Sequence, residues 1–168
     1  MKQWLILACL IACLGAAYAD TPWTVEKARQ EALKYIPDPF DTRIVESADP
    51  HYAENQRAKQ LHQQQVGNRT LTFFTTGGYG VSELGSTLAY YYDKDGHLQF
   101  LEVGHGESKY PYKSYKFSYP SGKLLSVSLN ITPLESYVFG PGGILAGHWV
   151  GPYCYDTHGN PQGLRRGK

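Results

Sequence analysis

Apolar and polar residues follow a helical period near the start of the chain. Thr24 precedes the first helical run as a candidate N-cap, and Pro37 follows it as a stop signal. Apolar residues recur in this run at helical spacing, with charged residues and glutamines between them: Val25, Ala28, Ala32, Tyr35 and Ile36. The pattern predicts an amphipathic helix over residues 24–36.

A second helix is predicted to begin at Asp49-Pro50, because an Asp N-cap followed by Pro at the first helical position is a typical start. The segment that continues to Gln65 is rich in helix-forming residues but poor in apolar ones. It is therefore either a surface helix held by a thin apolar stripe or a partly disordered linker. Together, residues 20–66 form a predicted N-terminal helical segment.

Beyond this segment the hydrophobic period changes to two, which is typical of β-strands. Residues 70–76 predict a first strand, and the clearest half-buried strand follows later, where Leu125, Val127, Leu129 and Ile131 alternate with polar residues. Three tyrosines, Tyr90 to Tyr92, are consecutive, so at least one of their rings must face opposite to its neighbours.

Residues 88–163 repeat one short phrase, in which aromatic residues, a turn containing Gly and an apolar run follow one another. The turn glycines, at positions 96, 122, 143 and 159, are separated by 26, 21 and 16 residues, so the period is irregular. The predicted fold class is α+β: an N-terminal helix, or two, is followed by an antiparallel β-sheet of stacked hairpin repeats over residues 67–163. Residues 164–168 form a basic tail.

The segment 143–163 contains a Gly-x-x-x-Gly-x-Trp strand followed by Tyr-Cys-Tyr-Asp-Thr-His-Gly, and it resembles the MORN-type repeats of the YwqK family. Residues 119–124 fit the same turn. Residues 92–96 fit it too and are also similar to the YD repeats of large secreted shell proteins. The spacing is irregular, and Trp occurs in one unit only. The resemblance implies a twisted ribbon of hairpins that acts as a scaffold or binding surface.

Residues 1–19 have the features of a Sec-type signal peptide. Lys2 precedes an apolar stretch, and Ala17-Tyr18-Ala19 is a small-x-small site that predicts cleavage before Asp20. The apolar stretch is too short for a membrane span, so no integral span is expected. As an alternative, residues 10–13 resemble a bacterial lipobox, which would anchor a lipoprotein through Cys13. The protein is expected to be periplasmic or secreted.

Charge and cysteine content narrow the function further. The full chain has 16 basic and 15 acidic residues, and loss of Lys2 with the signal peptide leaves equal numbers. This neutrality argues against nucleic-acid binding, which needs a basic surface. Cleavage also leaves Cys154 as the one remaining cysteine, so no internal disulfide is expected, and the thiol is either buried or able to form a dimer bond. The oligomeric state stays open.

Two clusters carry residues suited to chemistry. His148, Cys154 and His158 could hold a metal ion or supply a thiol nucleophile, as in a small secreted hydrolase or a metal-binding protein. His97, Glu102, His105 and Glu107 could pair for acid–base catalysis, and solvated loop residues are the simpler interpretation. No Gly-x-Ser-x-Gly signature is present, and no cofactor is expected.

Tyrosine is the most distinctive residue of the chain: 11 of its 14 copies lie between Tyr79 and Tyr155. Most are expected to pack across strands, while exposed rings could bind sugars, peptides or aromatic ligands. The candidate binding residues are Tyr91, Tyr110, Tyr112 and Trp149. We therefore expect an exported, non-enzymatic β-rich domain that binds or scaffolds a protein or a cell-envelope polymer.

Overall fold

The structure is a computed structural model that describes residues 23–164. These residues form two α-helices and one antiparallel sheet, in which eleven strands follow one another in the order of the sequence. The α+β class is confirmed, although most of the molecule is β-sheet. The predicted signal peptide, including Cys13, and residues 165–168 of the basic tail lie outside the described residues.

Helix α2 (Val25–Leu33) matches the first predicted helix. The Thr24 side chain accepts a hydrogen bond from the backbone N–H of Lys27, which confirms the predicted N-cap. Both buried residues of the helix are alanines, so it can lie close to the sheet. The helix ends at Leu33, before Pro37, whose neighbours are disfavoured in helical conformation.

Helix α3 (Tyr52–Gln60) is shorter than predicted at both ends. Asp49 does not cap it. The Asp49 carboxylate instead accepts hydrogen bonds from the backbone N–H of His51 and from the Asn55 side chain. The C-terminal end of the helix is marked by a hydrogen bond from the backbone N–H of Gln63 to the Ala58 carbonyl oxygen. Of the two predicted alternatives, the segment forms a surface helix, but its buried residues are the polar Asn55 and a single apolar residue, Ala58, rather than an apolar stripe.

The strands are short and regular, and a 3₁₀ turn (η2, Thr42–Ile44) lies in the connector between the helices. The strand bounds are β1 Gln65–Val66, β2 Arg69–Phe73, β3 Tyr79–Glu83, β4 Leu88–Tyr92, β5 Leu98–Val103, β6 Tyr112–Ser118, β7 Leu124–Thr132, β8 Glu135–Phe139, β9 Leu145–Val150, β10 Tyr153–Tyr155 and β11 Pro161–Leu164.

Strand β7 follows the predicted alternation except at its start. Val127, Leu129 and Ile131 are buried, as expected. Leu125 is instead exposed, and Leu124 packs against the core. The reason is a bulge in the pairing of β6 with β7, which shifts the register by one residue before Val127. The strand predicted over residues 70–76 corresponds to β2, which ends earlier than predicted, at Phe73, where the chain turns toward β3.

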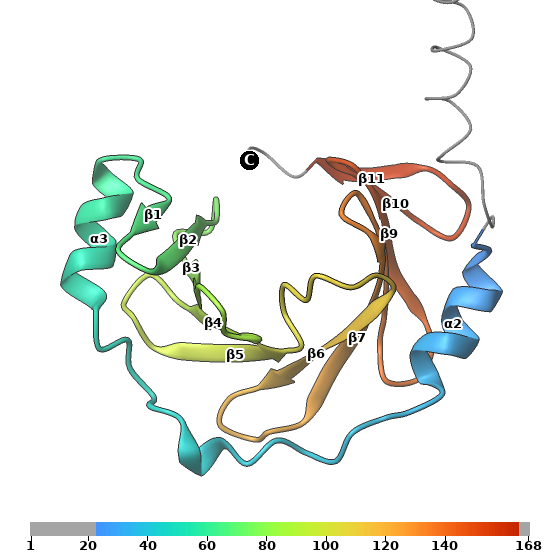
Figure 1. The fold of residues 1–168 in the computed structure, drawn as a ribbon, viewed down its shortest axis with the longest axis horizontal. Coiled ribbons are helices and arrows are strands. Elements are labelled where there is room, and N and C mark those ends of the chain that lie inside the picture. The colour runs from blue at the N-terminus through green and yellow to red at the C-terminus, as the bar shows by residue number, and fades with distance from the viewer. Residues whose placement is uncertain (1–22, 165–168) are drawn as a thin grey trace, which may run out of the picture.

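Both helices and their connector cover the outer face of the sheet (Figure 1). Helix α2 packs on β7 and β8 in one apolar cluster, which includes Ala28, Val127 and Phe139. Helix α3 contributes Ala58 to a second cluster with Leu71 and residues of β3 to β5. The core therefore lies between the helices and one face of the sheet.

The sheet curls strongly, so that its first and last strands rise on either side of an open space (Figure 1). The helices lie outside this curve, and the opposite face of the sheet is concave. Side chains alternate between the two faces along a strand. A strand whose apolar residues are buried under the helices on the outer face therefore presents its remaining residues to the concave face.

Candidate binding groove

The concave face forms one continuous groove. Residues from β2 to β10 line it, together with residues of the loop between β5 and β6, and its volume is about 1660 Å³. Pockets for small ligands have volumes of roughly 300–1,000 Å³. The groove is therefore large enough for part of a polymer.

Small polar residues form much of the groove floor. Thr72, Ser82, Ser128 and Ser136 come from four different strands. Within the described part of the chain, their hydroxyl groups form no hydrogen bond to another side chain or backbone group. A hydroxyl both donates and accepts hydrogen bonds, so these groups are available to a ligand.

A row of stacked aromatic rings crosses one side of the groove. The Tyr91 ring centroid lies 4.5 Å from that of Phe100 and 6.1 Å from that of Phe74. A Cβ atom at Gly80 would lie 3.1 Å from the Tyr91 ring, so the glycine makes room for it. The Lys116 ammonium lies over the row, 4.6 Å from the Phe100 centroid, where a cation is attracted to the ring face.

Glu102 is the most perturbed acid of the groove. Its side chain accepts a hydrogen bond of 2.8 Å from the Tyr91 hydroxyl, and His105 Nδ1 lies 3.7 Å from its Oε2 atom. Burial alone would raise the pKa of Glu102, but hydrogen bonds from His105, Ser114 and Tyr91 outweigh burial and lower the pKa to about 2. Glu102 is therefore ionised at neutral pH.

Lys116 is the cross-strand neighbour of Glu102 on the concave face. Burial lowers the pKa of Lys116, while the charge of Glu102 acts against this decrease. The two opposite charges lie next to each other in the same part of the groove and offset one another.

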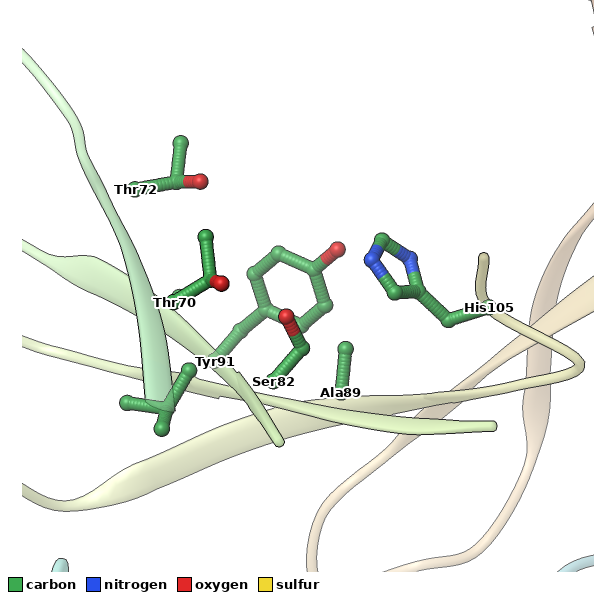
Figure 2. Close-up of a pocket in the computed structure, with 8 residues that line it drawn as sticks. Thr70, Thr72, Ser82, Ala89, Tyr91 and His105 are labelled. Atoms are coloured by element: carbon green, nitrogen blue, oxygen red, sulfur yellow. The ribbon is translucent and has the colours of Figure 1, made fainter. Parts of the chain in front are cut away.

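A small recess opens beside this cluster, between β2 and the His105 loop. Thr70 and Thr72 line one side of it, and Tyr91 and His105 line the other. Figure 2 shows the Tyr91 ring in the centre, with its hydroxyl directed toward the His105 side. The recess thus continues the polar floor up to the Glu102 cluster.

A second aromatic pair lies where the β5–β6 loop joins β6. The Tyr110 and Tyr112 ring centroids are 5.1 Å apart. Burial, together with the neighbouring Tyr110, raises the pKa of Tyr112 to about 12. The Tyr112 phenol is therefore neutral at physiological pH and can donate a hydrogen bond.

The structure brings the four predicted binding residues to one surface, since Tyr91, Tyr110, Tyr112 and Trp149 all line the groove. Among the three consecutive tyrosines, Tyr91 is the one that faces opposite to its neighbours, because only Tyr90 and Tyr92 pack against the apolar cluster under α3.

The predicted metal or thiol cluster is not assembled. Cys154 lies opposite Trp149 in the pairing of β9 with β10, and both residues line the concave face. His148 directly precedes Trp149 along β9 and therefore faces the other side of the sheet. His148 stacks on Tyr137 at 4.0 Å and forms a hydrogen bond of 3.0 Å with Glu135. His158 lies in an exposed turn. Residues 23–164 contain no group of three His, Cys, Asp or Glu side chains placed to hold a metal ion.

The other predicted cluster, of His97, Glu102, His105 and Glu107, is brought together only in part. His105 does lie beside Glu102, but the His97 side chain lies 3.5 Å from Asp93, within its own turn. Glu107 is exposed in the β5–β6 loop. The pair of Glu102 and His105 therefore lies in the groove, and Glu107, the other acid of the predicted cluster, does not lie beside it.

Several groove residues carry no distinctive signal in the sequence. Phe100 and Lys116 lie in ordinary strand patterns, and the alternation in β7 marks Ser126, Ser128 and Asn130 only as its polar half. Their alternation with apolar residues predicts which face they share. It does not predict that this face curls into a groove.

Comparison with known proteins found no matching family model, and no curated protein or solved structure was significantly similar to the chain. No helix among residues 23–164 is long and apolar enough to cross a membrane.

Proposed function

We propose that this protein is an exported, non-enzymatic binding domain whose concave groove holds a segment of a protein or of a cell-envelope polymer. The observation that carries the proposal is the groove itself, which is continuous, larger than a small-molecule pocket, and lined by hydroxyl groups and aromatic rings. Because the helices cover only the outer face, the opening of the groove stays accessible (Figure 1).

Export is part of the same proposal. The sequence of residues 1–19 supports cleavage before Asp20 and release into the periplasm or medium, with lipid anchoring at Cys13 as the alternative. The hairpin order of the strands is compatible with a stacked MORN-like repeat, whose role in this protein would be to build a wide, curved binding surface.

The proposal is tested with a substitution that fills the groove. Ser128 is half-buried on its floor, so Ser128→Trp places a large side chain there, while Leu125→Trp adds the same side chain at an exposed position of the same strand outside the groove lining. We expect the wild-type protein and Leu125→Trp to co-sediment with isolated cell envelopes, and Ser128→Trp to lose most of this binding. Equal binding by both variants would contradict the proposal.

A further inference from the structure

We infer that the ligand of the groove is a neutral glycan chain. This inference rests on the proposed function and adds the chemical class of the ligand. The hydroxyl groups of Thr72, Ser82, Ser128 and Ser136 are distributed over four strands and have no partner among the described residues. Sugar hydroxyls also donate and accept at one atom, so the two sets of groups are complementary.

The aromatic rings supply the second requirement. Sugar rings carry C–H groups on their faces and hydroxyls at their edges, so they pack on aromatic surfaces while their edges form hydrogen bonds. Phe74, at one end of the stacked row, is 38% exposed, and the pair of Tyr110 and Tyr112 lies on the side of the β5–β6 loop. Hydroxyl groups and aromatic rings thus line the same surface.

The charges of the groove favour a neutral chain. Glu102 is ionised, but Lys116 is its cross-strand neighbour and carries the opposite charge. The charged side chains that line the groove are nearly balanced: Asp93, Glu102 and Glu135 are acidic, and Lys94 and Lys116 are basic, so acids exceed bases by one. A strongly anionic or cationic polymer would need a large excess of opposite charge along the groove, and a difference of one charge does not supply it.

A polypeptide fits the floor less well. Extended peptides most often bind by adding a strand to an unpaired sheet edge. Each strand from β2 to β10 has a neighbour on both sides, so the groove floor has no such edge. A peptide there would rely on isolated hydroxyls to satisfy its regularly spaced amide groups.

Isothermal titration calorimetry with the protein purified after export tests the inference. The neutral probes are cellohexaose, chitohexaose, laminarihexaose and maltohexaose. The comparison probes are hexagalacturonate, which is acidic, and a disordered, uncharged Ser/Asn-rich peptide. We expect at least one neutral hexasaccharide to bind and both comparison probes to fail.

Variants locate the binding. Tyr112→Ala removes a groove ring, and Tyr153→Ala removes a ring that is 49% exposed and does not line the groove. We expect Tyr112→Ala to weaken binding of the neutral sugar about tenfold and Tyr153→Ala to leave it unchanged. Ser128→Trp, which leaves Tyr112 in place, should also abolish binding, so the test stands even if Tyr112→Ala misfolds.

Failure of the inference differs from failure of the proposed function. Binding of hexagalacturonate or the peptide alone, or no binding of any neutral sugar, overturns the glycan assignment. If envelope binding that is sensitive to Ser128→Trp persists in those cases, the groove still binds a ligand of another class. If that envelope binding is absent as well, the proposed function is overturned too.

Discussion

Glu102 illustrates how a single residue can keep a charge inside the groove. A half-buried carboxylate loses hydration, and this loss favours the neutral acid. Hydrogen bonds from the Tyr91 hydroxyl and from neighbouring groups reverse that preference and lower the pKa to about 2. The residue therefore stabilises the fold only while it is ionised.

This charge state predicts a pH-dependent stability. Because the pKa of Glu102 falls from 4.5 to about 2 on folding, its contribution is complete above pH 4.5 and is lost as the pH falls toward 2. We expect the stability difference between the wild type and Glu102→Gln to shrink by about 2 kcal/mol between pH 6 and pH 3. Urea denaturation at both pH values measures it, and a constant difference would contradict the assignment.

At the scale of elements, polar contacts attach α3 to the sheet. The Asp49 carboxylate is buried and accepts hydrogen bonds from the Tyr79 hydroxyl at 2.6 Å and from Asn55 at 2.8 Å. Arg69 donates to Asn55 and forms an ion pair with Glu54 on the same helix. With few apolar residues on α3, this network fixes where the helix lies.

Tyr79→Phe tests the network with the loss of one oxygen atom. The variant leaves the buried Asp49 carboxylate with one fewer donor, so we expect the free energy of unfolding to fall by about 1–3 kcal/mol. Tyr52→Phe is the matched control, because the Tyr52 hydroxyl bonds to the Lys94 carbonyl oxygen at an exposed site. Equal stability losses in the two variants, measured by denaturant unfolding, would show that the buried network has no special role.

The connector between the helices depends on one glycine. Gly122 has a φ of 66°, and a Cβ atom there would lie 2.1 Å from the Phe40 carbonyl oxygen. Phe40 in turn bonds to Gly122 through its backbone N–H and packs on the Phe117 ring. This contact holds the connector against the outer face between α2 and α3.

Gly122→Ala should therefore destabilise the protein more than left-handed geometry alone explains. Gly151 is the matched control, with a φ of 58° and no atom within 4 Å of an added Cβ. We expect Gly151→Ala to cost about 1–2 kcal/mol, from the backbone conformation, and Gly122→Ala to cost at least about 3 kcal/mol once the clash is added. Similar losses by thermal unfolding would argue against the close approach.

At the scale of the whole molecule, the sequence predicts the parts better than their arrangement. Alternation in β7 and the Thr24 cap are local signals, so both could be predicted. The Leu125 bulge depends on pairing with β6, and the start of α3 depends on contacts of Asp49 with distant residues, so the local pattern predicts neither. The candidate binding residues share a groove because the whole sheet curls, which no local pattern encodes.

Photo-crosslinking tests the central claim, that the concave groove is the binding surface, most directly. A benzophenone amino acid replaces Ser128 on the groove floor or, as the control, Leu125 at an exposed position of the same strand outside the groove lining. After irradiation of exported protein in its native envelope, we predict that the probe at position 128 gives a discrete macromolecular adduct and the probe at position 125 does not. Adducts of equal yield at both positions, or none at position 128, would contradict the claim.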